Sequence, residues 1–162
     1  MAAGIPLHSV YISLGSNIDP QKNIVRALHF LRQEGEIINL SQIWETQAVG
    51  SNGPNFLNAA LLYRSPYTRY PLKDCVLHPI EGRLGRVRTA DKNAPRPMDL
   101  DIIIFDDEVV ETDLWTRLYI ARPFAELLPD LINPQTGKSL RATADELQRS
   151  EVAVLHPEIV LK

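Results

Sequence analysis

The sequence predicts an α+β fold, in which helices pack on a mostly antiparallel sheet. Short β-rich runs recur along the chain, and segments with the apolar spacing of helices lie between them. Their order is strand, helix, strand, strand, helix, strand, which is typical of a ferredoxin-like core. The 162 residues, 44% hydrophobic and 23% charged, favour a single domain over 1–162.

The first half of the chain supplies the first four of these elements. They are a strand over 9–14, a helix over 20–34, and strands over 37–44 and 56–63. We expect Asp19 to cap the helix, because Pro20 follows it and proline is favoured at the first helical position. Gly35 predicts the end of the helix, and the Ser-Asn-Gly-Pro stretch over 51–54 predicts a loop between the last two strands.

The second half begins with another helix and strand and ends in short elements. The predicted elements are a helix over 72–84, a strand over 100–105, a short strand at 109–110, a short helix over 123–128 and a weak helix over 142–148. Pro79 is expected to kink or shorten the first of these helices, since proline lacks an N–H and clashes with the preceding turn. Asp106 and Asp107 predict a tight turn between the two strands.

Two carboxylates at the start of the strand over 100–105 are the most informative feature of the chain. Successive side chains of a strand alternate between faces, so Asp99 and Asp101 share one face while Leu100, Ile102 and Ile104 share the other. The apolar face belongs in a core. Two neighbouring carboxylates are costly to half-bury unless a cation meets them, and a pair of Mg²⁺ ions carrying a nucleotide's phosphates would do so.

A basic segment precedes the acidic pair, although the chain as a whole has a net charge of -3. Its cations are Arg83, Arg86, Arg88, Lys92 and Arg96, with Asp91 as the acid among them. Guanidinium groups suit phosphate because they donate two parallel hydrogen bonds. The two features together predict a polyphosphate site. The alternative is a strand whose two solvated aspartates form surface ion pairs with the neighbouring arginines.

Composition excludes several classes of protein. No apolar run is long enough to span a bilayer, and the segment 1–7 lacks the pattern of a signal peptide. Cys75 is the single cysteine, so no internal disulfide forms. The acidic balance argues against a broad nucleic-acid-binding surface. We therefore expect a cytoplasmic protein, monomeric, with neither a membrane nor a nucleic acid as partner.

A set of short motifs occurs in a fixed order along residues 10 to about 131. They are Leu14-Gly15-Ser16-Asn17, Trp44-Glu45-Thr46, Val49-Gly50, Asn55-Phe56-Leu57-Asn58-Ala59, Glu81 with Gly85-Arg86-Val87-Arg88, and Pro95-Arg96 before Asp99-Leu100-Asp101-Ile102. In this order they resemble the 6-hydroxymethyl-7,8-dihydropterin pyrophosphokinase family of folate biosynthesis. The resemblance implies ATP-dependent transfer of pyrophosphate to the hydroxymethyl group of a reduced pterin, giving AMP and the pterin diphosphate.

The resemblance also implies roles for individual residues. Asp99 and Asp101 match two Mg²⁺ ligands and, with Arg86 and Arg96, make the catalytic set. The residues implied to bind the nucleotide are Arg86, Arg88, Lys92, Arg96, Ile102 and Arg117. Those implied to bind the pterin are Gly15, Thr46, Val49, Phe56, Asn58 and Tyr119.

The chain departs from the family pattern after Val110. The segment 113–119 is several residues shorter than usual, and the family's ATP-contacting histidine has no match. We expect this segment to form a shortened wall of the ATP site, with Arg117 taking part of the phosphate contact. Gln47 and Asn93 stand where the family usually has proline and tryptophan.

These departures leave other functions open. One is a catalytically altered paralogue, or a non-catalytic pterin or nucleotide binder, on the same fold. Another is a nucleotidyltransferase, whose signature also combines Gly-Ser with Asp-x-Asp. In this chain one helix and two strands separate Gly15-Ser16 from Asp99, which counts against the second alternative.

Overall fold

The computed structural model describes residues 4–161, and residues 1–3 and 162 of the predicted domain lie outside this range. The strands are β1 His8–Ser16, β2 Glu36–Leu40, β3 Trp44–Thr46, β4 Phe56–Ser65, β5 Asp99–Phe105, β6 Glu108–Val109 and β7 Ala153–Leu155. The helical segments are α1 Pro20–Glu34, α2 Arg69–Leu72, the π-helical η1 Lys73–Leu77, α3 His78–Arg83, the 3₁₀-helical η2 Thr112–Trp115, α4 Leu118–Leu127 and α5 Leu140–Leu147.

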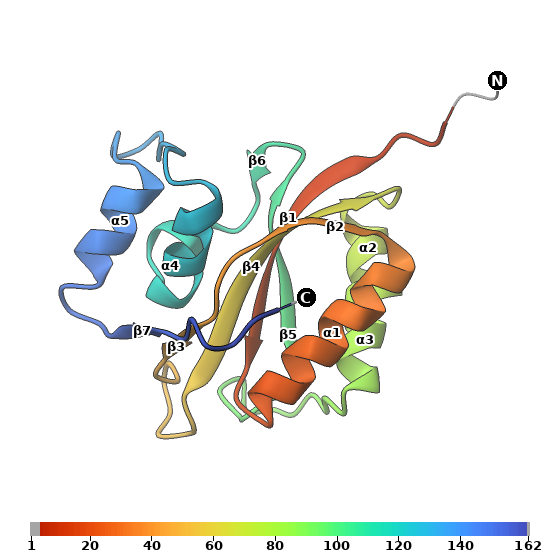
Figure 1. Ribbon diagram of the computed structural model, residues 1–162, viewed down its shortest axis with the longest axis horizontal. Coiled ribbons are helices and arrows are strands. Elements are labelled where there is room, and N and C mark those ends of the chain that lie inside the picture. Colours follow the sequence, from red (N-terminus) through yellow and green to blue (C-terminus); the bar gives the residue numbers. More distant parts are fainter. Residues whose placement is uncertain (1–3, 162) are drawn as a thin grey trace.

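The strands form one sheet in which every pairing is antiparallel. Its order is β6-β5-β1-β4-β3-β7, and β2 also pairs with β4. Figure 1 shows α1, α2 and α3 on one side of the sheet, and α4 and α5 on the other. The predicted α+β class with a ferredoxin-like core is thereby confirmed. No helix within residues 4–161 is long and apolar enough to cross a bilayer.

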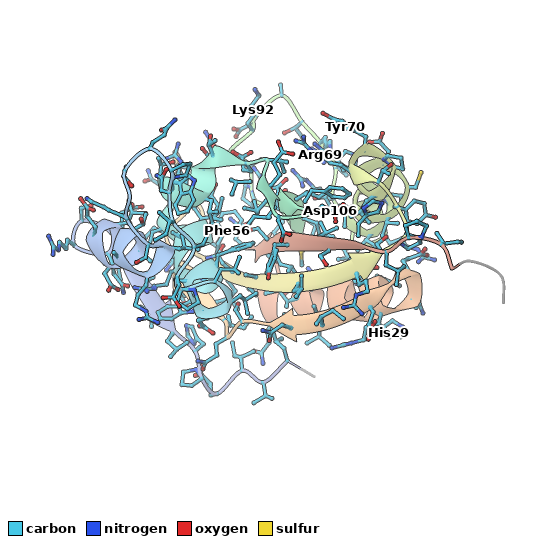
Figure 2. The ribbon with its side chains drawn as sticks, turned by 90° about the horizontal axis from the view of Figure 1, so that it is seen from above. His29, Phe56, Arg69, Tyr70, Lys92 and Asp106 are labelled. Atoms are coloured by element: carbon cyan, nitrogen blue, oxygen red, sulfur yellow. The ribbon has the colours of Figure 1, made fainter. Side chains whose placement is uncertain are left out.

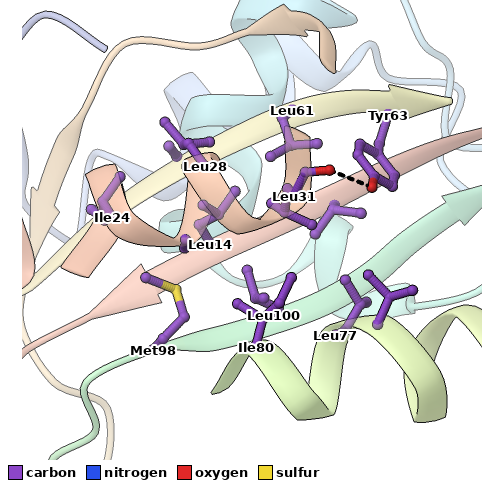
Figure 3. Close-up of a cluster of buried hydrophobic side chains, with 14 of the residues drawn as sticks. Leu14, Ile24, Leu28, Leu31, Leu61, Tyr63, Leu77, Ile80, Met98 and Leu100 are labelled. Carbon is purple, nitrogen blue, oxygen red and sulfur yellow. Dashed lines mark hydrogen bonds between the residues drawn. The ribbon is translucent and has the colours of Figure 1, made fainter. Parts of the chain in front are cut away.

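The larger core lies between the sheet and α1 with α3. Leu14 of β1 and Leu61 of β4 meet Leu28 of α1 there, as Figure 3 shows. The one polar group of this cluster is paired, because the Tyr63 hydroxyl donates a 2.7 Å hydrogen bond to the carbonyl of Leu31. Burying each such leucine stabilises the fold by about 1.5–3 kcal/mol. The apolar face of these strands is therefore held against α1 and α3, and the opposite face is available for a binding site.

The ends of α1 differ in how well they were predicted. The helix starts at Pro20 as expected, but Asp19 makes no side-chain cap. Its backbone is left-handed (φ 41°), unlike the extended conformation that aims an N-cap side chain at the first turn. The helix ends before Gly35 as expected. A Cβ on this glycine would lie 2.5 Å from the Tyr63 hydroxyl oxygen, so close packing requires glycine there.

The single strand predicted over 37–44 is wrong, because the structure divides it into β2 and β3. Ser41 lies between them, and its hydroxyl oxygen accepts a 2.8 Å hydrogen bond from the N–H of Ala60. The Ser41 hydroxyl thus replaces a backbone carbonyl as the acceptor for Ala60, and the regular strand pairing is interrupted there. β3 then runs on to Thr46 and pairs with β7, a strand that the sequence did not predict.

The two proline-containing helices also differ from expectation. The helix predicted over 72–84 starts at Arg69 and includes the π-helical turn η1. Pro79 follows that turn. In a regular helix its ring would clash with the carbonyl of Cys75, four residues earlier, and the π-helical turn widens the backbone there. The helix predicted to begin at Pro123 begins at Leu118 instead. Burial of apolar side chains along its length outweighs the cost of the internal proline.

The alternation of β5 is broken once. Its register against β1 shifts between Ile102 and Ile104, which leaves Ile103 as an extra residue in a bulge. Leu100 and Ile102 face the larger core, whereas Ile104 joins a second core with α4 and α5. The prediction that Ile104 shares a face with Leu100 is therefore wrong. The tight turn that follows forms as expected, with positive φ at both of its aspartates.

Candidate functional site

A row of polar residues crosses the sheet on the face that the larger core leaves free. Gly15 of β1 pairs with Asn58 of β4 on one side and with Asp99 of β5 on the other. Two residues further along, Ser13 pairs with Asp101. Because side chains alternate along each strand, the amide and both carboxylates share one face. All five residues line one cavity, here called the first cavity.

Gly15 keeps the middle of this row open. A Cβ at this position would lie 3.4 Å from Oδ1 of Asn58 and 3.6 Å from the ring of Phe56. Any larger side chain would therefore fill the space between the amide and the carboxylates. The glycine leaves room for a flat ligand on the sheet surface.

Asn58 is buried and its orientation is fixed. Its Nδ2 donates to Oγ1 of Thr46 at 2.9 Å and to the carbonyl of Trp44 at 3.1 Å. Both amide hydrogens are thereby used, and Oδ1 is left to accept from a ligand N–H. Phe56 and Tyr119 line the same cavity and supply aromatic surface. Aromatic rings with a few convergent polar groups suit a flat heteroaromatic ligand.

The rest of the first cavity comes from the end of β3, from loops, from η2 and from the start of α4. Its other lining residues are Thr46, Gln47, Val49, Lys92, Asn93, Arg96, Asp113, Arg117 and Tyr119. η2 carries Asp113, and Arg117 precedes the first turn of α4. Burial, with the charge of Asp113, raises the pKa of Tyr119, so its hydroxyl stays protonated and can donate a hydrogen bond.

A second cavity, here called the basic groove, adjoins the first. It shares Lys92, Arg96, Asp99 and Asp101 with the first cavity and adds Lys73, His78, Arg86, Val87, Arg88, Thr89, Asp91, Ala94 and Pro95. Figure 2 shows Lys92 on the extended loop between α3 and β5. The acidic pair thus stands at the boundary between a cavity suited to an aromatic ligand and a groove rich in cations.

A buried carboxylate holds two of the three arginines of the groove. Glu81 is 2% exposed, and its oxygens accept from Arg86 at 2.7 Å, Arg88 at 2.9 Å and the N–H of Leu100 at 2.8 Å. Arg86 also donates to Asp99 at 2.8 Å. Burial raises the pKa of Glu81, and the Leu100 N–H and the arginines oppose that effect. This network ties α3 to the first residues of β5.

Arg96 is held through its backbone. Its N–H donates to Oδ1 of Asn17 at 2.7 Å, and the N–H of Asn17 donates back to its carbonyl at 3.1 Å. Nδ2 of Asn17 also donates to the carbonyl of Pro54 at 3.2 Å. One buried asparagine therefore joins the loops that precede α1, β4 and β5.

Asp101 has the electrostatics expected of a cation ligand. Its carboxylate opens to the cavity and has no ion pair within residues 4–161. Desolvation by the surrounding protein, followed by the charges of Asp99 and Glu81, raises the pKa of Asp101 to about 7. A bound cation would remove this cost.

The donor set fits Mg²⁺ carried by a phosphate group. Among the described residues no group of three or more histidine, cysteine, aspartate or glutamate side chains is arranged to hold a metal by itself. Mg²⁺ is commonly bound by one or two carboxylates, with the remaining oxygens from water and substrate phosphates. Asp99 and Asp101 at the mouth of a basic groove match that pattern.

Most of the predicted site residues come together. The first cavity contains Gly15, Thr46, Val49, Phe56, Asn58, Arg117 and Tyr119, the basic groove contains Arg86 and Arg88, and Lys92, Arg96, Asp99 and Asp101 line both. Arg117, predicted to bind the nucleotide, lines the first cavity and not the basic groove. Ile102 lines neither cavity, since its side chain packs against the larger core on the other face. It follows Asp101 on the strand, so alternation already directs it away from the cavities.

Several residues at the site had no predicted role, and Asn17, Glu81, Lys73 and His78 are the ones that shape or line the basic groove. Asn17 and Glu81 lie within the short sequence motifs, so their place in those motifs is the signal that could have found them. Lys73 and His78 had no such signal. They reach the basic groove only through the π-helical turn between them.

Comparison with known proteins places the chain in a family. The model of the 7,8-dihydro-6-hydroxymethylpterin-pyrophosphokinase (HPPK) family matches residues 11–129. A Bacillus subtilis protein named 2-amino-4-hydroxy-6-hydroxymethyldihydropteridine pyrophosphokinase is 33% identical over 129 residues, covering 72% of this chain and 76% of that protein. Its Aquifex aeolicus namesake is 32% identical over 143 residues, covering 82% of this chain and 88% of that protein.

Other matches are to longer proteins. The folic acid synthesis protein fol1 of Schizosaccharomyces pombe is 33% identical over 150 residues, which are 85% of this chain and 20% of that protein. A crystal structure of Plasmodium falciparum HPPK-DHPS A437G with pteroate superposes with a TM-score of 0.68 at 11% identity, covering 92% of this chain and 45% of that one. The chain thus spans less than half of these two proteins, and the structural likeness concerns the fold.

Proposed function

Because the chain belongs to the 7,8-dihydro-6-hydroxymethylpterin-pyrophosphokinase family, we propose that its two cavities bind a hydroxymethyldihydropterin and ATP and transfer pyrophosphate between them in folate synthesis. The hydroxymethyl oxygen forms a bond to the β-phosphorus, the bond from that phosphorus to the α,β-bridging oxygen breaks, and AMP leaves. The observation that carries the proposal is the row Asn58, Gly15 and Asp99 across three strands, which places a fixed amide beside the acidic pair.

The first cavity takes the pterin in this proposal. Oδ1 of Asn58 accepts from the ring's N–H groups, and the rings of Phe56 and Tyr119 provide apolar contact. Thr46 keeps the amide in the accepting orientation. Bound there, the pterin points its hydroxymethyl group to the acidic pair, where the two cavities join.

The basic groove takes the phosphates of ATP. Arg86 and Arg96 are positioned by Glu81 and Asn17 before any ligand binds, so little reorganisation is needed when charge shifts during transfer. Asp99 and Asp101 would hold two Mg²⁺ ions, which would neutralise part of the phosphate charge when bound. Lys92, on the loop over both cavities, is placed to shield the reacting groups from water.

Product identity tests this function. Purified protein is incubated with Mg-ATP and 6-hydroxymethyl-7,8-dihydropterin, and the nucleotides are separated. Equal amounts of AMP and pterin diphosphate are expected. ADP as the product would contradict transfer from the β-phosphorus. Released inorganic pyrophosphate would indicate a nucleotidyltransferase, and pterin binding without any product would indicate a non-catalytic binder.

The state and location of the protein complete the proposal. We propose a monomer in the cytoplasm that uses no nucleic acid or membrane partner. Cys75 is a free, exposed thiol, which fits a reducing compartment. Light scattering at micromolar concentration and cell fractionation test these two points.

A further inference from the structure

The π-helical turn η1 directs two basic side chains into the basic groove. The N–H of His78 donates to the carbonyl of Lys73, five residues earlier, so the two residues stand one turn apart on the same side. In an α-helix, with 3.6 residues per turn, residues five apart point in different directions. Both side chains line the groove that also contains Asp99 and Asp101. π-bulges occur frequently at functional sites.

The three arginines of the groove are all engaged in ion pairs. Arg86 pairs with Glu81 and Asp99, Arg88 pairs with Glu81, and Arg96 pairs with Asp99. Lys73 makes no ion pair within the part of the chain that the structure describes, and its side chain is exposed. A free ammonium in a groove can bind an incoming anion without first breaking an ion pair.

His78 has surroundings that favour anion binding. Its Nδ1 lies 3.9 Å from Asp74, too far for a hydrogen bond. Desolvation, together with the charges of Arg88, Lys73 and Arg86, lowers the pKa of His78, and Asp74 opposes this. The cations around the ring thus lower its pKa, and an anion bound beside it would offset their charges.

We propose that Lys73 and His78 form a two-residue clamp, created by the π-helical turn η1, that binds the phosphate chain of ATP from the helical side of the basic groove. The inference rests on the proposed function for the identity of its ligand. It adds two residues to the polyphosphate site that lie outside the short sequence motifs. Both residues are ligand contacts, since they line the groove themselves.

Equilibrium binding of a nucleotide without pterin tests the clamp. Calorimetric titration with Mg²⁺ and α,β-methylene-ATP, whose α,β bridge does not cleave, measures affinity without turnover. Lys73→Gln is expected to weaken binding about tenfold and His78→Gln about threefold, in line with the loss of a charged and a weaker hydrogen bond in an open groove. Lys73→Arg, which keeps the charge, is expected to retain most of the affinity.

Arg69→Gln is the matched control. Arg69 lies on α2, one turn before Lys73, and its guanidinium stacks 5.1 Å over the ring of Tyr70 rather than facing either cavity. This variant removes the same charge from the same helical segment. Its nucleotide affinity should stay within about twofold of wild type.

Two further measurements identify what the clamp touches. Mg²⁺ with inorganic tripolyphosphate should lose affinity for Lys73→Gln by the same factor as the nucleotide analogue. The pKa of the His78 ring, followed by NMR, should rise when the analogue binds. A loss seen with the nucleotide but not with tripolyphosphate would overturn the proposal, because the contact would then be to the base or ribose.

The outcomes separate this inference from the proposed function. Equal affinity of Lys73→Gln and wild type for the analogue overturns the clamp, whatever the enzyme's activity. A second outcome is that wild type binds the analogue and the variants bind it more weakly as expected, but no AMP forms with the pterin. In that case the clamp stands and the proposed function fails. If wild type binds neither analogue nor tripolyphosphate, both fail.

Discussion

At the scale of single residues, the site combines groups with opposite electrostatic needs. Asp101 is a carboxylate whose ionisation the protein disfavours, while Asn58 is a neutral amide whose donors are already used. The first needs a cation and the second needs a donor. A ligand pair that brings Mg²⁺ to one and ring N–H groups to the other meets both needs at once.

Replacing Asp101 tests the first need. Asp101→Asn is expected to lower turnover on the order of a thousandfold, because a hard cation loses an anionic ligand worth several kcal/mol in the transition state. The decrease should persist over a range of Mg²⁺ concentrations. Unchanged activity over that range would contradict metal ligation by this residue.

The same variant has a stability signature in the absence of metal. The pKa of Asp101 is about 7 in the folded protein, against an ordinary value of 3.8. The folded state therefore loses stability as the pH rises from about 4 to about 7, and Asp101→Asn removes that loss. At pH 8 the metal-free variant should unfold about 2–4 °C higher, equivalent to about 1 kcal/mol after discounting for solvent screening. At pH 4 the two melting temperatures should coincide.

Arg117 lines the first cavity together with the acidic pair, and its replacement tests the prediction that this segment also contacts the nucleotide. Arg117→Ala is expected to weaken binding of α,β-methylene-ATP about tenfold and to lower turnover with it, by the loss of one charged hydrogen bond. Phe56→Leu is the comparison, since it should affect mainly the pterin. A structure with the analogue in which the Arg117 guanidinium points into bulk water would end this hypothesis.

At the scale of elements, the site depends on how loops are joined to strands. Asn17 connects three loops through hydrogen bonds to Arg96 and Pro54. Glu81 connects α3 to β5 in the same way. Both side chains are buried, so their groups have no water to replace a lost partner.

Removing the Asn17 side chain should therefore affect both stability and catalysis. Asn17→Ala is expected to lower the free energy of unfolding by about 2–3 kcal/mol, because it leaves buried backbone groups without partners. Urea denaturation measures this. Asn17→Asp keeps the acceptor for the Arg96 N–H and loses the donor to Pro54, so it should fall between wild type and alanine. Equal stability of all three proteins would show that water replaces these bonds.

At the scale of the whole molecule, the C-terminal strand closes the sheet beside the first cavity. β7 pairs with β3, which carries Thr46. His156 follows β7 and bonds Glu45 of β3 at 2.8 Å and Glu158 at 2.6 Å. The hydrogen bond to Glu158 and then that to Glu45, with the charges of both carboxylates, raise the pKa of His156, against the effect of partial burial.

This arrangement predicts a pH dependence of the sheet edge. Because the folded pKa of His156 is raised, its contribution to stability is fully present below about pH 6.5 and is lost as the pH rises through the folded value. Amide hydrogen exchange at Ala153 and Leu155, corrected for intrinsic rates, should be faster above that value. His156→Gln should exchange at one corrected rate across the range, and a pH-dependent rate in this variant would contradict the assignment.

The sequence determined the local features of this protein. Period-two alternation assigned Asp99 and Asp101 to one face and Leu100 to the other, since the direction of a strand side chain depends on its immediate backbone alone. For the same reason the sequence predicted the basic segment, the main strands and the start of α1. Mg²⁺ ligation and nucleotide contacts remain predictions for the experiments above.

Only the tertiary structure decided how these local pieces meet. The row of Asn58, Gly15 and Asp99 requires the pairing register of three strands far apart in the chain, which no local pattern fixes. The bulge at Ile103 and the π turn that brings Lys73 beside His78 depend on packing against distant elements as well as on propensity. Local periodicity therefore determines which face of a strand each side chain occupies. Long-range strand pairing determines which side chains lie next to one another on that face.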